Sequence, residues 1–347
     1  MTMQEIGKTS KGIILTADTP ISTTAFNILT TGTADGYLAL PMTSLGVSYI
    51  VGTFKPNTNS YDKYGTSFAV GAPYDNTVIN ITLSTSGVSV PGQFHREGDT
   101  ITVVLDKLDT FYIETTTKYQ DLTGTRIVSN KPVAVVCGNV CSYKNGCNHL
   151  VEYLPPMSKW GSKFMRSSSG IIRIVSSVNN TRVVVTAKIS NKTYTFSTFL
   201  DIETVPTQPY SISSDRPVLV LLVFNATTVG MSIIPSKKHF SNEIVLVSPP
   251  QFSYERNAPF DNYIVVSIRT TDQSGLQLRP LNGTNLPRVG SVTFPDVDGE
   301  LYSFITVTCN NHQTCSVQHI DNSVAFSVIV YGFQEYEAFA YPANLSL

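Results

Sequence analysis

The sequence predicts an all-β protein, built from two or three tandem antiparallel β-sandwich-like modules with almost no helix. Short runs of β-branched and aromatic residues recur along the chain, each bounded by Gly, Pro, Asn, Asp or Ser. No window combines apolar residues at helical spacing with capping residues. A β-propeller is the alternative, because it too is built from repeated antiparallel units.

The expected strands follow one another from residue 47 to near the end of the chain. Only short turns, such as residues 155–160, look helical. The clearest strand candidates are residues 47–54, 77–83, 100–105, 110–116, 132–138, 171–178, 182–189, 217–224, 262–269 and 324–333.

One pattern occurs twice, as IVSNKPV at residues 127–133 and as ISSDRPV at residues 212–218. In each copy we expect a polar turn that ends with Pro at the first residue of a strand buried on both faces. The related segments LPPMSKW and IPSKKHF follow after a loop, and a degenerate third copy begins at Ile320. The repeat predicts three modules, at residues 1–165, 166–250 and 251–347.

Composition allows a large core and excludes some partners. Hydrophobic residues make up 41% of the 347 residues and charged residues 14%, against about 25% in a typical soluble domain. The formal net charge is -1, and no Lys/Arg run could follow a phosphate backbone, so we expect no nucleic-acid partner. No apolar run is long enough to span a bilayer, so we expect no membrane span.

Four of the five cysteines form two pairs with the same spacing. Cys141 and Cys147 enclose SYKNG, and Cys309 and Cys315 enclose NNHQT, both of them polar turn-forming segments. In an oxidising compartment this spacing predicts two local disulfides that shape loops. Cys137 then remains as a free thiol buried in an apolar strand.

Two metal sites are weaker alternatives. Cys137, Cys141, Cys147 and His149 are residue types that bind Zn²⁺, but their spacing departs from the usual knuckles. Residues 296–300 (DVDGE) resemble part of a Ca²⁺ loop but lack its distal bidentate Glu, so an acidic surface turn is favoured. We expect neither a metal nor a cofactor.

Motifs of catalysis are missing from the sequence. There is no nucleophile elbow, HExxH motif, P-loop or dinucleotide fingerprint, and no feature selects a carboxylate pair for glycoside hydrolysis. The histidines share no common spacing, and we expect structural roles for them and no enzyme activity. They are His95, His149, His239, His312 and His319.

Several features favour an extracellular location. The chain is rich in Thr, Ser, Val and Tyr, and it carries six Asn-x-Ser/Thr sequons that are candidates for N-glycosylation. The first residues lack the pattern of a signal peptide, so we expect that signal upstream of this sequence, either as part of a longer protein or as a leader outside these residues. The sequons are at Asn80, Asn179, Asn191, Asn225, Asn282 and Asn344.

Residues 121–164 resemble the signature of the amino-terminal domain family of IgGFc-binding proteins. The shared features are DLTGT, then SNKPV, a Cys-bearing loop, HLVE, Pro-Pro and Trp-Gly, in that order. Residues 36–54 and 330–343 resemble the early and closing elements of the same family. The family's loop cysteines fall on Cys141 and Cys147, whereas Cys137 departs from its pattern, which usually has a small residue such as Ser there.

This resemblance implies an extracellular β-rich module of large multidomain proteins of mucus and cell surfaces. The expected function is non-catalytic adhesion or scaffolding, in which surface loops engage glycoprotein or mucin-type partners. The partners could include other domains of a longer chain. The alternatives are a carbohydrate-active enzyme with an unrecognised carboxylate pair and a lectin, which would show exposed aromatic side chains beside amides.

Overall fold

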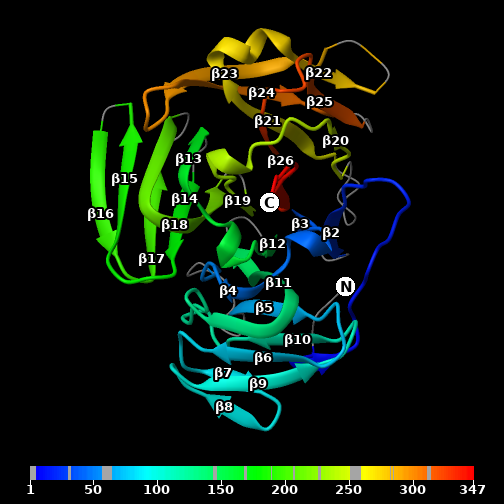
Figure 1. Cartoon of the computed structure of the whole chain (residues 1–347), viewed down its shortest axis with the longest axis vertical. Helices are drawn as coiled ribbons and strands as arrows, with labels where there is room; N and C mark the ends of the chain where they lie inside the picture. The colour runs from blue at the N-terminus through cyan, green and yellow to red at the C-terminus, as the bar shows by residue number, and fades with distance from the viewer. Residues whose placement is uncertain are drawn as a thin grey trace.

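The computed structural model describes residues 5–29, 33–56, 65–143, 147–167, 170–188, 190–205, 208–225, 228–250, 259–281, 283, 285–310 and 314–347. Antiparallel strands dominate these ranges (Figure 1), which confirms the all-β prediction. The number of strands in a sheet ranges from two to eight. The blades of a β-propeller, in contrast, are repeated four-stranded sheets. The helical turns are η1 (Met42–Ser44), η2 (Met157–Lys159), η3 (Lys237–His239) and η4 (Thr270–Gly275).

The first sheet has eight strands and lies at the bottom of Figure 1. Its order is β1-β10-β5-β11-β6-β9, and β4 and β12 also pair with β11. Its strands are β1 (Gly7–Thr9), β4 (Gly46–Ile50), β5 (Thr66–Gly71), β6 (Thr77–Thr82), β9 (Thr100–Leu105), β10 (Thr110–Glu114), β11 (Arg126–Tyr143) and β12 (Cys147–Tyr153). A separate hairpin joins β7 (Val88–Val90) to β8 (Gln93–His95).

The second sheet has seven strands and forms the left side of Figure 1. Its order is β16-β15-β18-β14-β17, and β13 and β19 also pair with β18. Its strands are β13 (Gly161–Ser167), β14 (Gly170–Ser176), β15 (Thr181–Ala187), β16 (Ser190–Phe196), β17 (Phe199–Thr204), β18 (Pro209–Asn225) and β19 (Val229–Ile233).

The third part is a sandwich of two sheets, at the top of Figure 1. A five-stranded sheet, β23-β24-β21-β26-β27, and a three-stranded sheet, β20-β25-β22, share one hydrophobic core. These strands are β20 (Val245–Val247), β21 (Asp261–Arg269), β22 (Leu276–Pro280), β23 (Arg288–Pro295), β24 (Leu301–Thr308), β25 (Cys315–His319), β26 (Ser327–Phe333) and β27 (Ala338–Pro342).

The repeated sequence pattern lies within β11 and β18, each of which is one continuous strand instead of a turn followed by a strand. Before Pro132, β11 pairs with β4 and β6. After it, β11 pairs with β5 and β12, and Val133 still pairs with Gly46 of β4. Around Pro217, β18 changes its partners from β13 and β15 to β14 and β19. Proline has no N–H to donate, so a strand can change partners there without losing a ladder hydrogen bond.

Four strands from different parts of the chain meet in the middle of the molecule, where the C-terminus lies in Figure 1. They are β3 (Thr33–Leu38), which forms a hairpin with β2 (Thr24–Leu29), and the strands β12, β19 and β27. Leu219 and Leu221 of the second sheet belong to the core of the first. We therefore propose that the three modules expected from the sequence fold together and not separately.

Candidate functional site

Two disulfides close short loops between consecutive strands. Cys141, near the end of β11, is bonded to Cys147, the first residue of β12. Cys309, which follows β24, is bonded to Cys315, the first residue of β25. Residues 144–146 and 311–313, and with them His312, lie outside the described residues. The geometry leaves each loop fixed at its base by a covalent bond.

Cys137 is a free cysteine in the middle of β11. The residue is 2% exposed, and its thiol donates a hydrogen bond to the carbonyl oxygen of Gly52, 3.0 Å from Sγ. Burial raises the pKa of the thiol above its ordinary value, so it stays protonated and unreactive. Because Cys141 and Cys147 are bonded to each other, the alternative zinc site lacks two of its ligands.

Buried polar side chains, here called the central polar cluster (Thr33, Asp35, Asn148, His149 and Glu152), connect the four central strands. Asn148 accepts hydrogen bonds from the Thr33 hydroxyl at 3.0 Å and from the Ala34 amide at 2.9 Å. Its own amide donates to the carbonyl oxygens of Val229 at 2.7 Å and Ala338 at 2.8 Å. One side chain of β12 therefore binds β3, β19 and β27.

The two carboxylates of the cluster make similar links. Asp35 accepts hydrogen bonds from the amides of Val151 at 2.9 Å and Ala340 at 3.1 Å. Glu152 accepts one from the amide of Ile233 at 2.7 Å. The central strands meet here without the hydrogen bonds of a β-sheet. The two carboxylates accept hydrogen bonds from backbone amides that would otherwise be buried without a partner.

Burial changes the protonation of these groups. It raises the pKa of Asp35 well above its ordinary value and that of Glu152 from 4.5 to about 8, although backbone hydrogen bonds act against it in both cases. His149 shares a 3.0 Å hydrogen bond with the Thr33 hydroxyl, and burial lowers its pKa to about 4. The cluster therefore holds a neutral imidazole and carboxyl groups that ionise reluctantly.

Arg173 on β14 joins the second sheet to the first. Its guanidinium pairs with Asp121 at 2.7 Å and with Asp201 at 2.6 Å, and it also donates to the Thr53 carbonyl. The rings of Phe54 and Phe199 lie 4.3 and 4.2 Å from the guanidinium carbon. This buried, charged side chain contacts two carboxylates, one backbone carbonyl and two aromatic rings. We therefore assign it a structural role at the contact between the two sheets.

The DVDGE segment forms a turn between β23 and β24. Lysine side chains neutralise its carboxylates. The Asp296 carboxylate accepts hydrogen bonds from the backbone amides of Asp298 and Glu300 and forms an ion pair with Lys237. Lys163 lies 2.7 Å from Asp298. Within the part of the chain that the structure describes, no group of three His, Cys, Asp or Glu is arranged for a metal ion.

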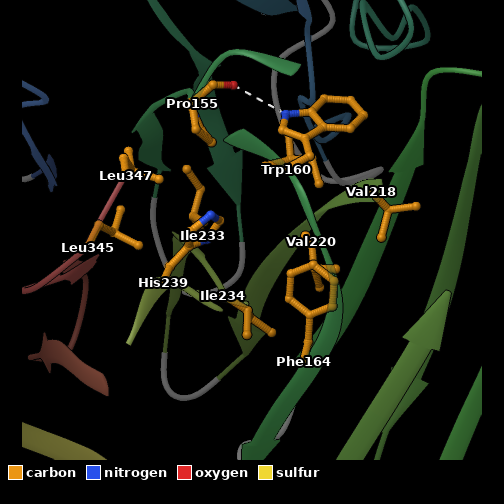
Figure 2. A pocket seen from close by; sticks show the side chains of 12 residues that line it. Pro155, Trp160, Phe164, Val218, Val220, Ile233, Ile234, His239, Leu345 and Leu347 are labelled. Carbon is orange, nitrogen blue, oxygen red and sulfur yellow. Dashed lines mark hydrogen bonds between the residues drawn. The ribbon is translucent and has the colours of Figure 1, made fainter. Parts of the chain in front are cut away.

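A small pocket lies between η2, β13, β18 and the last residues of the chain (Figure 2). Apolar side chains line most of it, and the Trp160 indole N–H on its wall donates to the Pro155 carbonyl at 3.2 Å. His239 turns its Nδ1 to the Ser236 hydroxyl at 3.0 Å. The volume of about 10 Å³ is enough for roughly one water molecule.

The other histidines have structural contacts. His319 at the end of β25 lies with Nε2 2.8 Å from the Asp272 carbonyl oxygen. His95 at the end of β8 lies 3.8 Å from the Asp99 carboxylate. Neither lies among the residues that line the pocket.

The candidate glycosylation sites differ in exposure. Asn80, Asn179 and Asn191 are exposed, on β6, in the turn before β15 and on β16 respectively. Asn344 is 8% exposed, and its amide is hydrogen-bonded to the backbone of Val328 and Phe326. The side chain of Asn225 and the whole of Asn282 lie outside the described residues.

A family model described as IgGFc binding protein matches residues 35–332. The chain belongs to the IgGFc-binding protein family. Over 154 residues it is 32% identical to the IgGFc-binding protein of Homo sapiens, a match that covers 44% of this chain and 3% of the human protein. No helix within the described ranges is long and apolar enough to cross a membrane.

The geometry assigns structural roles to the signature that this chain shares with the IgGFc-binding family. Asp121, the first residue of DLTGT, forms an ion pair with Arg173. The Thr123 hydroxyl oxygen accepts a hydrogen bond from the backbone amide of Thr53 at 2.9 Å. In the HLVE segment, His149 and Glu152 belong to the central polar cluster. Sequence reasoning missed Asp35 and Arg173 as parts of these networks, because their partners are far away in the sequence.

Proposed function

We propose that this member of the IgGFc-binding family is an extracellular, non-catalytic binding module that engages glycoprotein partners through its two disulfide-closed loops. The observation that carries the proposal is the closure of both loops at their base, by Cys141–Cys147 and Cys309–Cys315. A loop that is fixed at its ends loses less conformational entropy when it binds. Binding residues commonly lie on loops that a rigid scaffold positions.

The use of the ionisable groups supports binding over catalysis. The buried Asp35 and Glu152 accept backbone hydrogen bonds, and Arg173 joins two sheets. The described pocket has space for about one water molecule. These groups have roles in the scaffold, which leaves the surface loops for partners.

Disulfides and sequons support the extracellular location, because disulfides persist in oxidising compartments. The name of the human relative suggests the Fc region of immunoglobulin G as one glycoprotein to test. Mucin-type glycoproteins are the other, since the resemblance implies a protein of mucus and cell surfaces.

Surface plasmon resonance with the immobilised chain tests the proposal, with an immunoglobulin G Fc fragment and a purified mucin as analytes. Two variants replace residues 142–146 or 310–314 by Gly and Ser, leaving the cysteines in place. A matched control replaces Pro91 and Gly92, in the exposed turn between β7 and β8.

We expect at least one glycoprotein to bind, and at least one loop replacement to remove most of that binding while the control retains it. If neither glycoprotein binds, or if both loop variants bind like the unmodified chain, the proposal is wrong.

A further inference from the structure

The first sheet has an open face, formed by side chains of β6, β9 and the first half of β11. Residues along these strands alternate between core and solvent: Ile79 and Ile81 are fully buried, whereas Asn80 and Thr82 are exposed. Both β6 and β9 lie at the lower end of Figure 1, away from the four central strands. The middle of the open face consists of Val78, Asn80, Thr82, Thr102, Val104 and Val128.

Three valines lie among the polar residues of the open face. Val104 is 49% exposed, Val128 is 43% exposed, and Val78 is half-buried. The cross-strand pairs place Val78 opposite Val104, and Val128 opposite Asn80. Asn80 therefore has apolar neighbours both along its own strand and across the sheet.

The side-chain amide of Asn80 presents its nitrogen on this face. The Thr102 hydroxyl on β9 donates a hydrogen bond to Oδ1 at 2.8 Å, and Nδ2 makes no hydrogen bond to any residue that the structure describes. Because Oδ1 and Nδ2 lie on opposite sides of the amide carbon, the bond to Thr102 turns Nδ2 away from β9. Asn80 begins the sequon Asn80-Ile81-Thr82, in which Nδ2 is the atom that receives a glycan.

The other sequons with a described side chain lack this combination. Asn191 lies opposite Thr186 on the edge strand of the second sheet. Asn179 lies in a turn outside the strands, and the Asn344 amide donates to the Phe326 carbonyl oxygen in the core. Of these four, Asn80 is the sequon that joins an available Nδ2 to an exposed valine directly across the sheet.

A first N-acetylglucosamine at Asn80 would lie over these valines. Directly opposite residues of antiparallel strands have Cβ atoms about 5 Å apart, so a ring bonded to Nδ2 reaches the methyl groups of Val128. The ring carries C–H bonds and its acetyl group ends in a methyl, so contact with valine removes apolar surface from water. Valine is stiff at χ1, and the contact therefore costs little side-chain entropy.

We propose that Asn80 carries an N-linked glycan whose first sugar packs on Val128, so that the open face is covered and does not bind protein partners. In the secretory pathway a lipid diphosphate-linked oligosaccharide is the donor. Nδ2 loses a proton and bonds to C1 of the first sugar, and the lipid diphosphate leaves. The inference rests on the extracellular location in the proposed function, and it adds which face of the chain a glycan closes.

Production of the whole chain in two hosts tests the site. A eukaryotic secretory host glycosylates sequons, whereas the periplasm of a bacterial host without that pathway provides only the oxidising conditions that disulfides need. Glycopeptide mass spectrometry of the secreted chain should find Asn80 occupied. Asn80→Gln should lower the melting temperature by about 2 °C or more in the first host and by less than about 1 °C in the second, because only the first comparison removes a sugar.

Two further variants separate packing on the valine from a general effect of glycans. Val128→Thr keeps the β-branched shape but replaces a methyl group by a hydroxyl, so it should lower the melting temperature of the glycosylated chain and leave that of the unglycosylated chain nearly unchanged. In the double variant with Asn80→Gln, the effect of Val128→Thr should disappear. Asn191→Gln is the matched control, and it should leave the melting temperature unchanged in both hosts.

Three results would overturn this inference: an unoccupied Asn80 in the secreted chain, an equal effect of Asn80→Gln in the two hosts, or an effect of Val128→Thr that does not depend on the glycan. A loss for Asn191→Gln as large as that for Asn80→Gln would also overturn it. Occupancy and melting temperature are measured without a partner glycoprotein, so the glycan site and glycoprotein capture can fail independently.

Discussion

Arg173 and Asp121 form an ion pair at 2.7 Å that joins the second sheet to the first, and both side chains are less than one-tenth exposed. They lie 52 positions apart in the sequence. The first residue of the family signature thus has its partner in a segment outside that signature. This contact explains why an acidic residue at the DLTGT turn suits the fold.

Replacement of Arg173 by Met should therefore reduce the free energy of unfolding by about 3 to 5 kcal/mol, because Asp121 would remain as a buried, unpaired charge. Asp201→Asn should cost less, since Asp201 is 39% exposed and water can replace its partner. Urea unfolding followed by circular dichroism measures both. Arg182→Met on the exposed side of β15 is the control, and a loss for Arg173→Met no larger than for this control would contradict the role.

Stability should fall as the pH rises from 6.5 to 8. The pKa of Glu152 is raised by burial to about 8, so the folded chain keeps a proton that the unfolded chain, with a pKa near 4.5, has released. The stabilisation is complete below pH 4.5 and is lost as the pH rises through 8; the raised pKa of Asp35 acts in the same direction.

His149 acts in the opposite direction at lower pH. Its pKa is lowered from 6.5 to about 4, so between these values the unfolded chain binds more protons and acid destabilises the fold. The window from 6.5 to 8 isolates the carboxyl groups. Glu152→Gln should flatten the stability profile there, whereas the exposed Glu97→Gln should leave it unchanged; parallel profiles for all three proteins would refute the assignment.

Thiol titration should detect no reactive cysteine in the native protein. Cys137 is buried and protonated, and the other four cysteines are in disulfides. Unfolding without a reductant should reveal one thiol, and unfolding with one should reveal five. A rapid reaction of the native chain, or more than one thiol without reduction, would be inconsistent with this pairing.

Asn344 should remain unmodified in a host that glycosylates sequons, because a glycan on its amide would disturb the bonds to Val328 at 2.7 Å and Phe326 at 3.0 Å. Asn344→Gln should cost about 1 to 3 kcal/mol, as unsatisfied buried backbone groups do. Asn191→Gln on the exposed strand β16 should be neutral. Glycopeptide mass spectrometry measures glycan occupancy, and thermal unfolding measures the change in stability. A glycan found on every copy of Asn344 would contradict its buried position.

Sequence patterns predict those features of the fold that depend on neighbouring residues. The strand composition predicts the all-β class, and the recurring Pro-containing pattern identifies β11 and β18 as related strands. The same pattern does not reveal that these strands run through Pro132 and Pro217. Continuation depends on new partner strands on the other side of each proline, which no local signal encodes.

The candidate site shows the same division. Equal cysteine spacing points to short loops, a local property. The links from Asn148 to Val229 and Ala338 span 81 and 190 positions, and the stacked rings of Tyr263 and Tyr331 join β21 to β26. Such contacts arise only when distant strands meet in the folded chain, and a single sequence carries no periodicity that pairs them.

The position of β27 in the middle of the molecule has a consequence for biosynthesis. A chain emerging from the ribosome can pair β3 with β2 and β12 with β11 early, but Asn148 and Asp35 must wait for residues 338–342 before their last partners exist. The carboxyl and amide groups of the central strands therefore stay hydrated until β27 has been synthesised. A nascent chain that stops before β27 should remain a substrate for chaperones, even when its earlier sheets have already formed.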